Sequence, residues 1–134
     1  MKPLLAITLV LGCASARVHT VALPQTIGEI GGIYQPWTPR HEREARAVLT
    51  CVGLDSLGSR PTLWVAPRQL TVGTDLVMAY YDPDAQAVVF APIAMDMGWY
   101  WMVFRHEVIH HATHEGNDAP QFEKADSCGF WPAK

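Results

Sequence analysis

Two stretches of the chain have the pattern of a helix, and in the first of them apolar residues recur at helical spacing. In the first stretch they stand at i, i+3, i+4 and i+7, as Ala45, Val48, Leu49 and Val52. This spacing gives a helix one buried face. Thr38 can cap the helix ahead of Pro39, and Gly53 can end it. The pattern therefore predicts a helix over 39–52 with its charged residues facing solvent.

The second stretch covers residues 97–115 and has a different pattern. Its first half, from Trp99 to Phe104, is apolar on every side, and its second half is rich in histidine. Asp96 can cap this helix and Gly116 can end it. A helix that begins without a polar face is usually buried. We therefore expect a central helix over 97–115.

Between the two helices the pattern changes to that of strands. Residues 62–65 form one short apolar run, and residues 76–81 and 86–91 flank an Asp-Pro-Asp-Ala turn at 82–85. Two such runs about a turn predict a β-hairpin. The chain is thus expected to be an α+β domain with a small, mostly antiparallel sheet. The tail after residue 116 is expected to be irregular.

The first 16 residues are typical of an export signal. A lysine at position 2 precedes an apolar run at 4–11, which is far shorter than the ~20 residues of a membrane span. Small residues at 14–16 suit ordinary cleavage and secretion. Residues 10–13 instead resemble a bacterial lipobox, in which Cys13 is lipidated and attaches the chain to a membrane. We expect export and favour the lipoprotein form.

Length and charge limit the organisation of the remaining chain. Residues 17–36 hold scattered Pro and Gly and are expected to form a linker that can include one short strand, which leaves 37–134 as a single domain. The formal net charge is −3, with 17% charged residues. This balance gives no electrostatic reason to expect a nucleic-acid partner.

The cysteine count is odd, and export would explain it. If Cys13 belongs to the signal, Cys51 and Cys128 remain as a pair. In an oxidising compartment these two are expected to form a disulfide. The alternative is two separate buried thiols.

The candidate chemistry lies in the second helix, where His106-Glu107-Val108-Ile109-His110 is an HExxH sequence. Residues i and i+4 share one helix face, so both imidazoles can reach one Zn²⁺. Glu107 is turned about 100° from His106 and can take a proton from a zinc-bound water. The motif predicts two zinc ligands and one general base.

On this motif the chain resembles the zincin metallopeptidases, in particular very small bacterial zincin-like domains, over about residues 38–128. The resemblance implies Zn²⁺ as cofactor and a peptide or protein as substrate. It also implies that residues 86–91 form the sheet edge along which an extended substrate pairs.

The HExxH motif does not include the third ligand, which has to come from residues after the helix. The metzincin position for a third histidine is Gly116 here. In small zincin-like domains a His-Pro pair follows the helix, and the corresponding stretch 116–120 reads Gly-Asn-Asp-Ala-Pro. By that likeness Asp118 is the expected ligand, because a carboxylate suits zinc. Four alternatives remain open: His114, Glu115, Glu123 and Asp126.

Other polar residues carry weaker expectations. Tyr80 or Tyr81 can donate to a developing oxyanion, although tyrosines in a hairpin more often serve packing. His111 points away from the metal face and is expected to be exposed. His41 is isolated in the sequence and is expected to have no part in the site.

Together these features predict an exported, single-domain zinc peptidase with Glu107 as its base. Two other hypotheses remain open: a catalytically silent envelope lipoprotein that binds a metal or a partner, and a structural module without metal.

Overall fold

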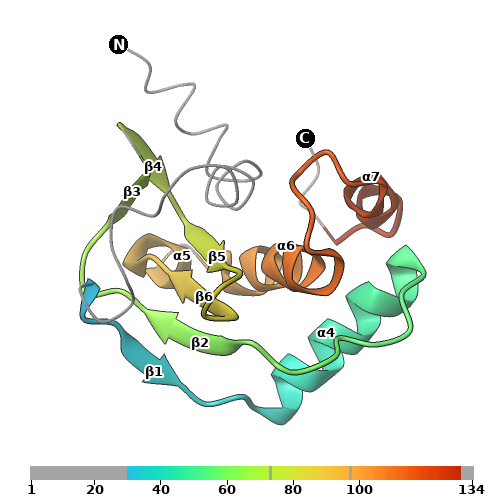
Figure 1. Cartoon of the computed structure of the whole chain (residues 1–134), viewed down its shortest axis with the longest axis horizontal. Coiled ribbons are helices and arrows are strands. Elements are labelled where there is room, and N and C mark those ends of the chain that lie inside the picture. Colours follow the sequence, from blue (N-terminus) through green and yellow to red (C-terminus); the bar gives the residue numbers. More distant parts are fainter. Residues whose placement is uncertain (1–29, 73, 97, 131–134) are drawn as a thin grey trace.

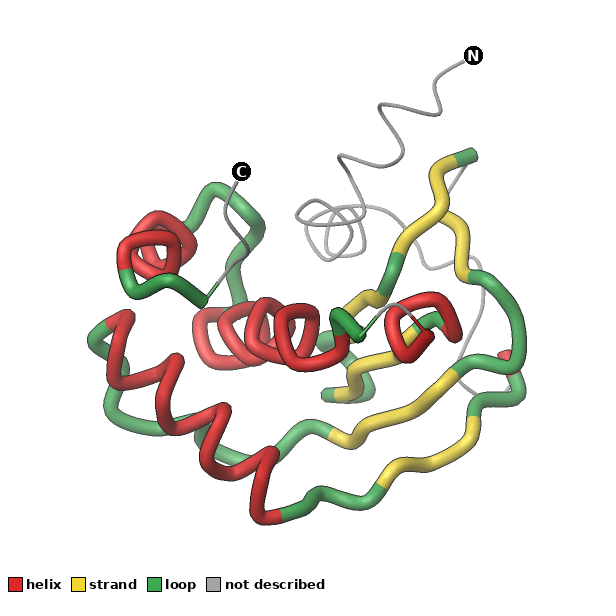
Figure 2. The backbone as a smooth tube through the Cα atoms, turned by 180° about the vertical axis from the view of Figure 1, so that it is seen from behind, coloured by secondary structure: helices red, strands yellow, loops and turns green. Residues whose placement is uncertain are grey.

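Helix α6 (Tyr100–Thr113) runs through the middle of the molecule. The computed structural model describes residues 30–72, 74–96 and 98–130. Helix α4 (Pro39–Val52) lies along one side of α6, the sheet along another, and α7 (Pro120–Ser127) sits over its C-terminal half (Figure 1). The view from behind shows the same arrangement (Figure 2). The expectation of a central second helix is confirmed.

The main sheet has the strand order β1-β2-β6-β5. Its members are β1 (Ile33–Gln35), β2 (Thr62–Val65), β6 (Ala87–Phe90) and β5 (Ala79–Asp82). The β2–β6 pair is parallel, and the β1–β2 and β5–β6 pairs are antiparallel. Two short strands, β3 (Leu70–Val72) and β4 (Asp75–Val77), form a separate ribbon. The mixed α+β class with a mostly antiparallel sheet is confirmed.

Local chemistry explains where α4 begins and ends. The Thr38 hydroxyl accepts from the His41 backbone N–H, and His41 Nδ1 accepts from the Thr38 backbone N–H at 3.0 Å. This reciprocal capping box uses histidine where Glu or Gln is usual. Gly53 ends the helix with a φ of 78°, which glycine adopts without strain. The predicted range 39–52 is confirmed.

The predicted hairpin exists, but its first strand is divided. Asp82 Oδ1 accepts from the backbone N–H groups of Asp84 and Ala85, which fixes the turn. The predicted strand 76–81 is interrupted at Met78, because β4 pairs with β3 while β5 pairs with β6. The apolar run was continuous in sequence, and only the pairing partners show the break.

The predicted helix 97–115 is too long at both ends. A short helix α5 (Pro92–Asp96) precedes it, and Gly98 has a φ of 70° that separates the two helices. At the other end His114 adopts a left-handed conformation with a φ of 57°, so α6 stops before Gly116. The expectation of an irregular tail was also wrong, because residues 120–127 form α7.

One core joins the helices to the sheet, and a disulfide closes it. Its buried members come from α4, α6, the sheet and α7 and include Val48, Leu63, Phe90, Phe104 and Ala125. Cys51 near the end of α4 is bonded to Cys128 at the end of α7, as predicted. Among the described residues, no helix has the length and apolarity to cross a membrane. The predicted signal at 1–16, with Cys13, and most of the linker lie outside these residues.

Candidate metal centre

His106 and His110 meet on one face of α6. Their Nε2 atoms lie 3.1 Å apart. Both side chains are buried, with exposed fractions of 9% for His106 and 0% for His110. The i, i+4 spacing predicted this juxtaposition, and the structure brings the two rings together as expected.

The backbone that follows α6 fixes the orientation of His110. His110 Nδ1 lies 2.6 Å from the carbonyl oxygen of Glu115. A carbonyl oxygen only accepts, so in this contact Nδ1 carries the proton and donates it. Nε2 is then the ring nitrogen that faces His106. Metal-binding histidines are commonly oriented in this way.

Asn117 is the residue after α6 whose side chain reaches both histidines. Its Oδ1 lies 2.8 Å from His110 Nε2 and 3.1 Å from His106 Nε2. Its Nδ2 is buried and has no hydrogen-bond partner within the described part of the chain. The loop thus brings an amide to the position where the sequence predicted a carboxylate.

Asp118 is exposed, and the structure does not bring it to the histidines. The alternative ligands are exposed as well: His114, Glu115, Glu123 and Asp126. Over residues 30–72, 74–96 and 98–130, no three His, Cys, Asp or Glu side chains are grouped to hold a metal. The resemblance pointed to this loop, but the side chain that reaches the histidines is one position earlier.

The donor atoms of His106, His110 and Asn117 fit a zinc ion. Zinc binds histidine nitrogen at about 2.0–2.1 Å, so neighbouring ligands in a tetrahedral site lie about 3.3 Å apart. The three atoms here are separated by 2.8 to 3.1 Å. A small expansion of the triangle would admit the ion. The two imidazoles suit zinc, and the amide oxygen is a neutral and weaker donor.

Glu107 follows His106 on α6 and is also buried, with an exposed fraction of 2%. The helical turn of about 100° per residue points its side chain away from the line of the two histidines. It therefore stands beside the donor triangle instead of forming part of it. This is the relation that the sequence predicted for a general base.

Phe122 of α7 covers the two imidazoles. Its ring centroid lies 4.6 Å from that of His106 and 4.8 Å from that of His110. Burial, followed by the neighbouring His110, holds the pKa of His106 well below its usual value, although the contact with Asn117 opposes the shift. His106 is therefore neutral at pH 7, which is the form that binds a metal.

His111 is buried, so the expectation that it is exposed was wrong. The Tyr81 hydroxyl donates to His111 Nδ1 at 2.8 Å, and His111 Nε2 donates to the Ser59 carbonyl. Burial raises the pKa of Tyr81 to about 12, which keeps its proton in place. This hydroxyl serves the link between β5, α6 and the Ser59 loop and is not directed to an oxyanion.

The expected substrate edge at 86–91 was also wrong. Strand β6 lies inside the sheet, because it pairs with β2 on one side and with β5 on the other. Its main-chain groups are already used by these strands. The sequence showed a hairpin but gave no sign that β2 would add to it in parallel.

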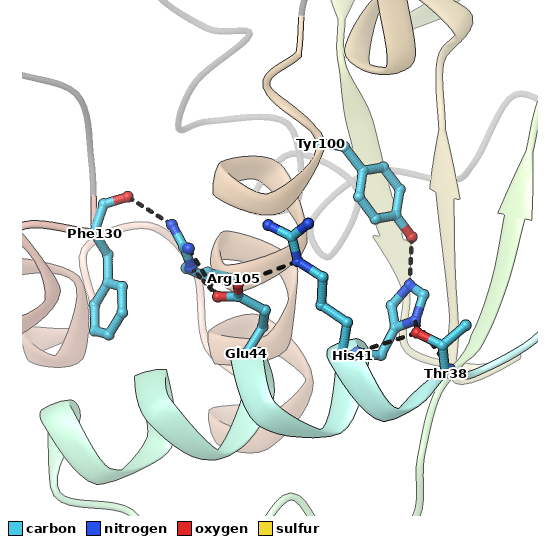
Figure 3. Close-up of polar contacts among 7 residues, drawn as sticks. Thr38, His41, Glu44, Tyr100, Arg105 and Phe130 are labelled. Atoms are coloured by element: carbon cyan, nitrogen blue, oxygen red, sulfur yellow. Dashed lines mark hydrogen bonds and ion pairs between the residues drawn. The ribbon is translucent and has the colours of Figure 1, made fainter.

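Polar contacts hold α6 against α4 (Figure 3). Arg105 donates from Nε to Glu44 at 2.8 Å and from another nitrogen to the Phe130 carbonyl. At the start of α6, the Tyr100 hydroxyl lies 2.8 Å from His41 Nε2. These contacts hold α6 against α4 and against the segment that follows α7.

Comparison of the chain with protein-family models, with curated proteins and with solved structures gives no match. The expected resemblance to zincins therefore rests on the HExxH motif in the sequence.

Proposed function

We propose that this protein is a zinc-dependent peptidase. The observation that supports it best is the meeting of two buried histidine Nε2 atoms 3.1 Å apart, with Glu107 next to His106 on the same helix. A zinc ion held by His106 and His110 would lower the pKa of a bound water to about 7 and polarise a peptide carbonyl.

The remaining roles belong to groups of the protein itself. Glu107 accepts the proton of the attacking water and returns it to the leaving amine. The Glu115 carbonyl holds His110 in the orientation in which Nε2 can bind the metal. Phe122 keeps bulk water away from both imidazoles. Low polarity around the site strengthens each of these charge interactions.

The place of action is proposed to be an oxidising compartment, reached through the export signal. The Cys51–Cys128 disulfide supports this, because such bonds persist in secreted proteins and in the bacterial envelope.

A second candidate is a catalytically silent metal-binding protein. The observation that favours it is the burial of both histidines beneath Phe122. A peptide reaches Glu107 and the metal only if this ring moves aside. The two candidates therefore differ in whether α7 opens.

The test compares wild type with Glu107→Gln and Phe122→Ala. Zinc content is measured after dialysis, and hydrolysis is measured with casein and with a quenched peptide library. The peptidase predicts about one zinc per chain in wild type and Glu107→Gln, with activity lost only in Glu107→Gln, by at least about 100-fold. Phe122→Ala should keep zinc and cleave faster, because it opens the site.

The outcomes separate the candidates. Zinc in all three proteins with no hydrolysis in any of them supports the silent binder. Equal hydrolysis by wild type and Glu107→Gln removes Glu107 from the mechanism. Failure of wild type to bind zinc eliminates both candidates.

A further inference from the structure

One atom of Asn117 lies against both candidate histidine ligands. Its Oδ1 is 2.8 Å from His110 Nε2 and 3.1 Å from His106 Nε2. The other ring nitrogen of His110, Nδ1, is held by the Glu115 carbonyl at 2.6 Å. The nitrogen of His110 that faces Asn117 is therefore the one that a metal-binding histidine presents to its ion.

His106 completes a triangle of donor atoms. Its Nε2 lies 3.1 Å from both His110 Nε2 and Asn117 Oδ1. Three nitrogen and oxygen atoms that converge at these distances can bind one metal ion together, because the ion accepts a lone pair from each of them.

The loop after α6 positions both the Glu115 carbonyl and the Asn117 side chain. His114 takes a left-handed conformation that ends α6, and the Thr113 hydroxyl accepts from the Glu115 N–H at 3.2 Å. The same turn then supplies the carbonyl that orients His110 and, two residues later, the side chain of Asn117. Asn117 Nδ2 is buried without a hydrogen-bond partner in the described structure, so the polar contacts of this side chain there are those of Oδ1 with the two imidazoles.

We propose that Asn117 is the third protein ligand of the metal, binding through Oδ1. This inference rests on the proposed zinc site and assigns to it a residue that the motif does not contain. The neighbouring Asp118 carboxylate stays in solvent and takes no part.

A neutral amide is a weaker zinc ligand than a carboxylate, and this gives the proposal a signature. Asn117→Asp puts a carboxylate oxygen at the same position with almost the same size, so it should bind zinc more tightly than wild type. Asn117→Ala removes the donor. Asp118→Asn is the matched control, because it removes a charge one residue away and leaves the donor triangle intact.

The experiment is a competition titration of Zn²⁺ against a chromophoric chelator, with the full folded protein and these three variants. Loss of a group that only supports a ligand costs roughly 10- to 100-fold in metal affinity, so Asn117→Ala should lose at least that much. Asn117→Asp should gain at least about tenfold, and Asp118→Asn should stay within about twofold of wild type. Far-ultraviolet circular dichroism confirms that each variant is folded.

A crystal structure of the zinc-loaded wild type is the second measurement. The proposal expects Asn117 Oδ1 at about 2.0–2.2 Å from the metal. A water or the Asp118 carboxylate in that position overturns it, as does unchanged zinc affinity in folded Asn117→Ala. If wild type binds zinc while Asn117→Ala is unaffected, only this inference fails. If wild type binds no zinc, the proposed function fails with it.

Discussion

His41 and His110 are both buried histidines, and they use their ring nitrogens in opposite ways. His41 Nδ1 accepts from the Thr38 N–H at 3.0 Å, and its Nε2 donates to the Tyr100 hydroxyl at 2.8 Å. Each nitrogen thus meets a group of complementary character. His110 also satisfies Nδ1, through Glu115, but its Nε2 faces His106 and the acceptor oxygen of Asn117.

The contrast separates a structural histidine from a candidate ligand. Burial alone does not, because both side chains are buried, as is His111 with its two partners Tyr81 and Ser59. What distinguishes His110 is that its Nε2 lies within 3.1 Å of two further atoms that can bind a metal, His106 Nε2 and Asn117 Oδ1. We therefore expect changes near His41 to affect stability, and changes near His110 to affect metal binding.

The largest expected effect comes from removing the disulfide with Cys51→Ser and Cys128→Ser together. The bond spans 77 residues, and on the chain-entropy relation its loss costs up to about 4.5 kcal/mol of unfolding free energy. It also frees α7, which carries Phe122 over His106 and His110. Urea unfolding should show the loss of stability, and zinc affinity should fall in the same variant.

The His41 region supplies the control for that double variant. His41 lies at the interface of α4 with the start of α6 (Figure 3), away from α7. The nuclear magnetic resonance signal of its imidazole should therefore keep its wild-type position. Zinc affinity equal to that of wild type would contradict the role assigned to α7.

A smaller effect is expected from His41→Ala. This change removes the partner of the Tyr100 hydroxyl and leaves a cavity beside Trp37, Trp101 and Phe104. It should cost about 2–3 kcal/mol of unfolding free energy, measured with urea. Zinc affinity, measured with the same chelator, should not change.

The matched variant for this site is His41→Gln. Glutamine is a usual residue at this position of a capping box, so the N-terminus of α4 keeps its cap while the ring contacts are lost. His41→Gln should therefore be more stable than His41→Ala. Loss of zinc binding in either variant would remove the distinction between the two histidine sites.

The smallest expected effect is a dependence of stability on pH. Burial, followed by the charge of Arg40, lowers the pKa of His41 in the folded protein below its usual value of about 6.5. At a pH between the pKa of His41 in the folded protein and its usual value in the unfolded chain, the unfolded chain binds more protons than the folded one. The contribution of His41 is therefore fully present above pH ~6.5 and is lost as the pH falls toward the folded pKa.

Urea unfolding of wild type and His41→Gln across this pH range checks the prediction. His106 and His111 also have lowered pKa values in the folded protein, so both proteins should lose stability in acid. The loss should be smaller in His41→Gln, since its side chain does not titrate. Parallel curves for the two proteins would refute the assignment to His41.

Features that depend on near neighbours in the chain could be predicted from the sequence. Spacing placed His106 and His110 on one helix face, Thr38 and Gly53 marked the ends of α4, and the Asp82 turn marked the hairpin. The pairing of Cys51 with Cys128 followed from a count and from the expected compartment. Each of these rests on a periodicity, a local hydrogen bond or the number of cysteines.

Features that depend on distant segments or on the path of a loop could be seen only in the folded chain. Helix α7 carries little apolar periodicity, so the sequence did not predict it. It is held in place by packing against α4 and by the disulfide. The interior position of β6 depends on β2, which joins it from more than twenty residues earlier. Asn117 and Asp118 are adjacent in sequence, and only the left-handed turn at His114 determines which of them faces the histidines.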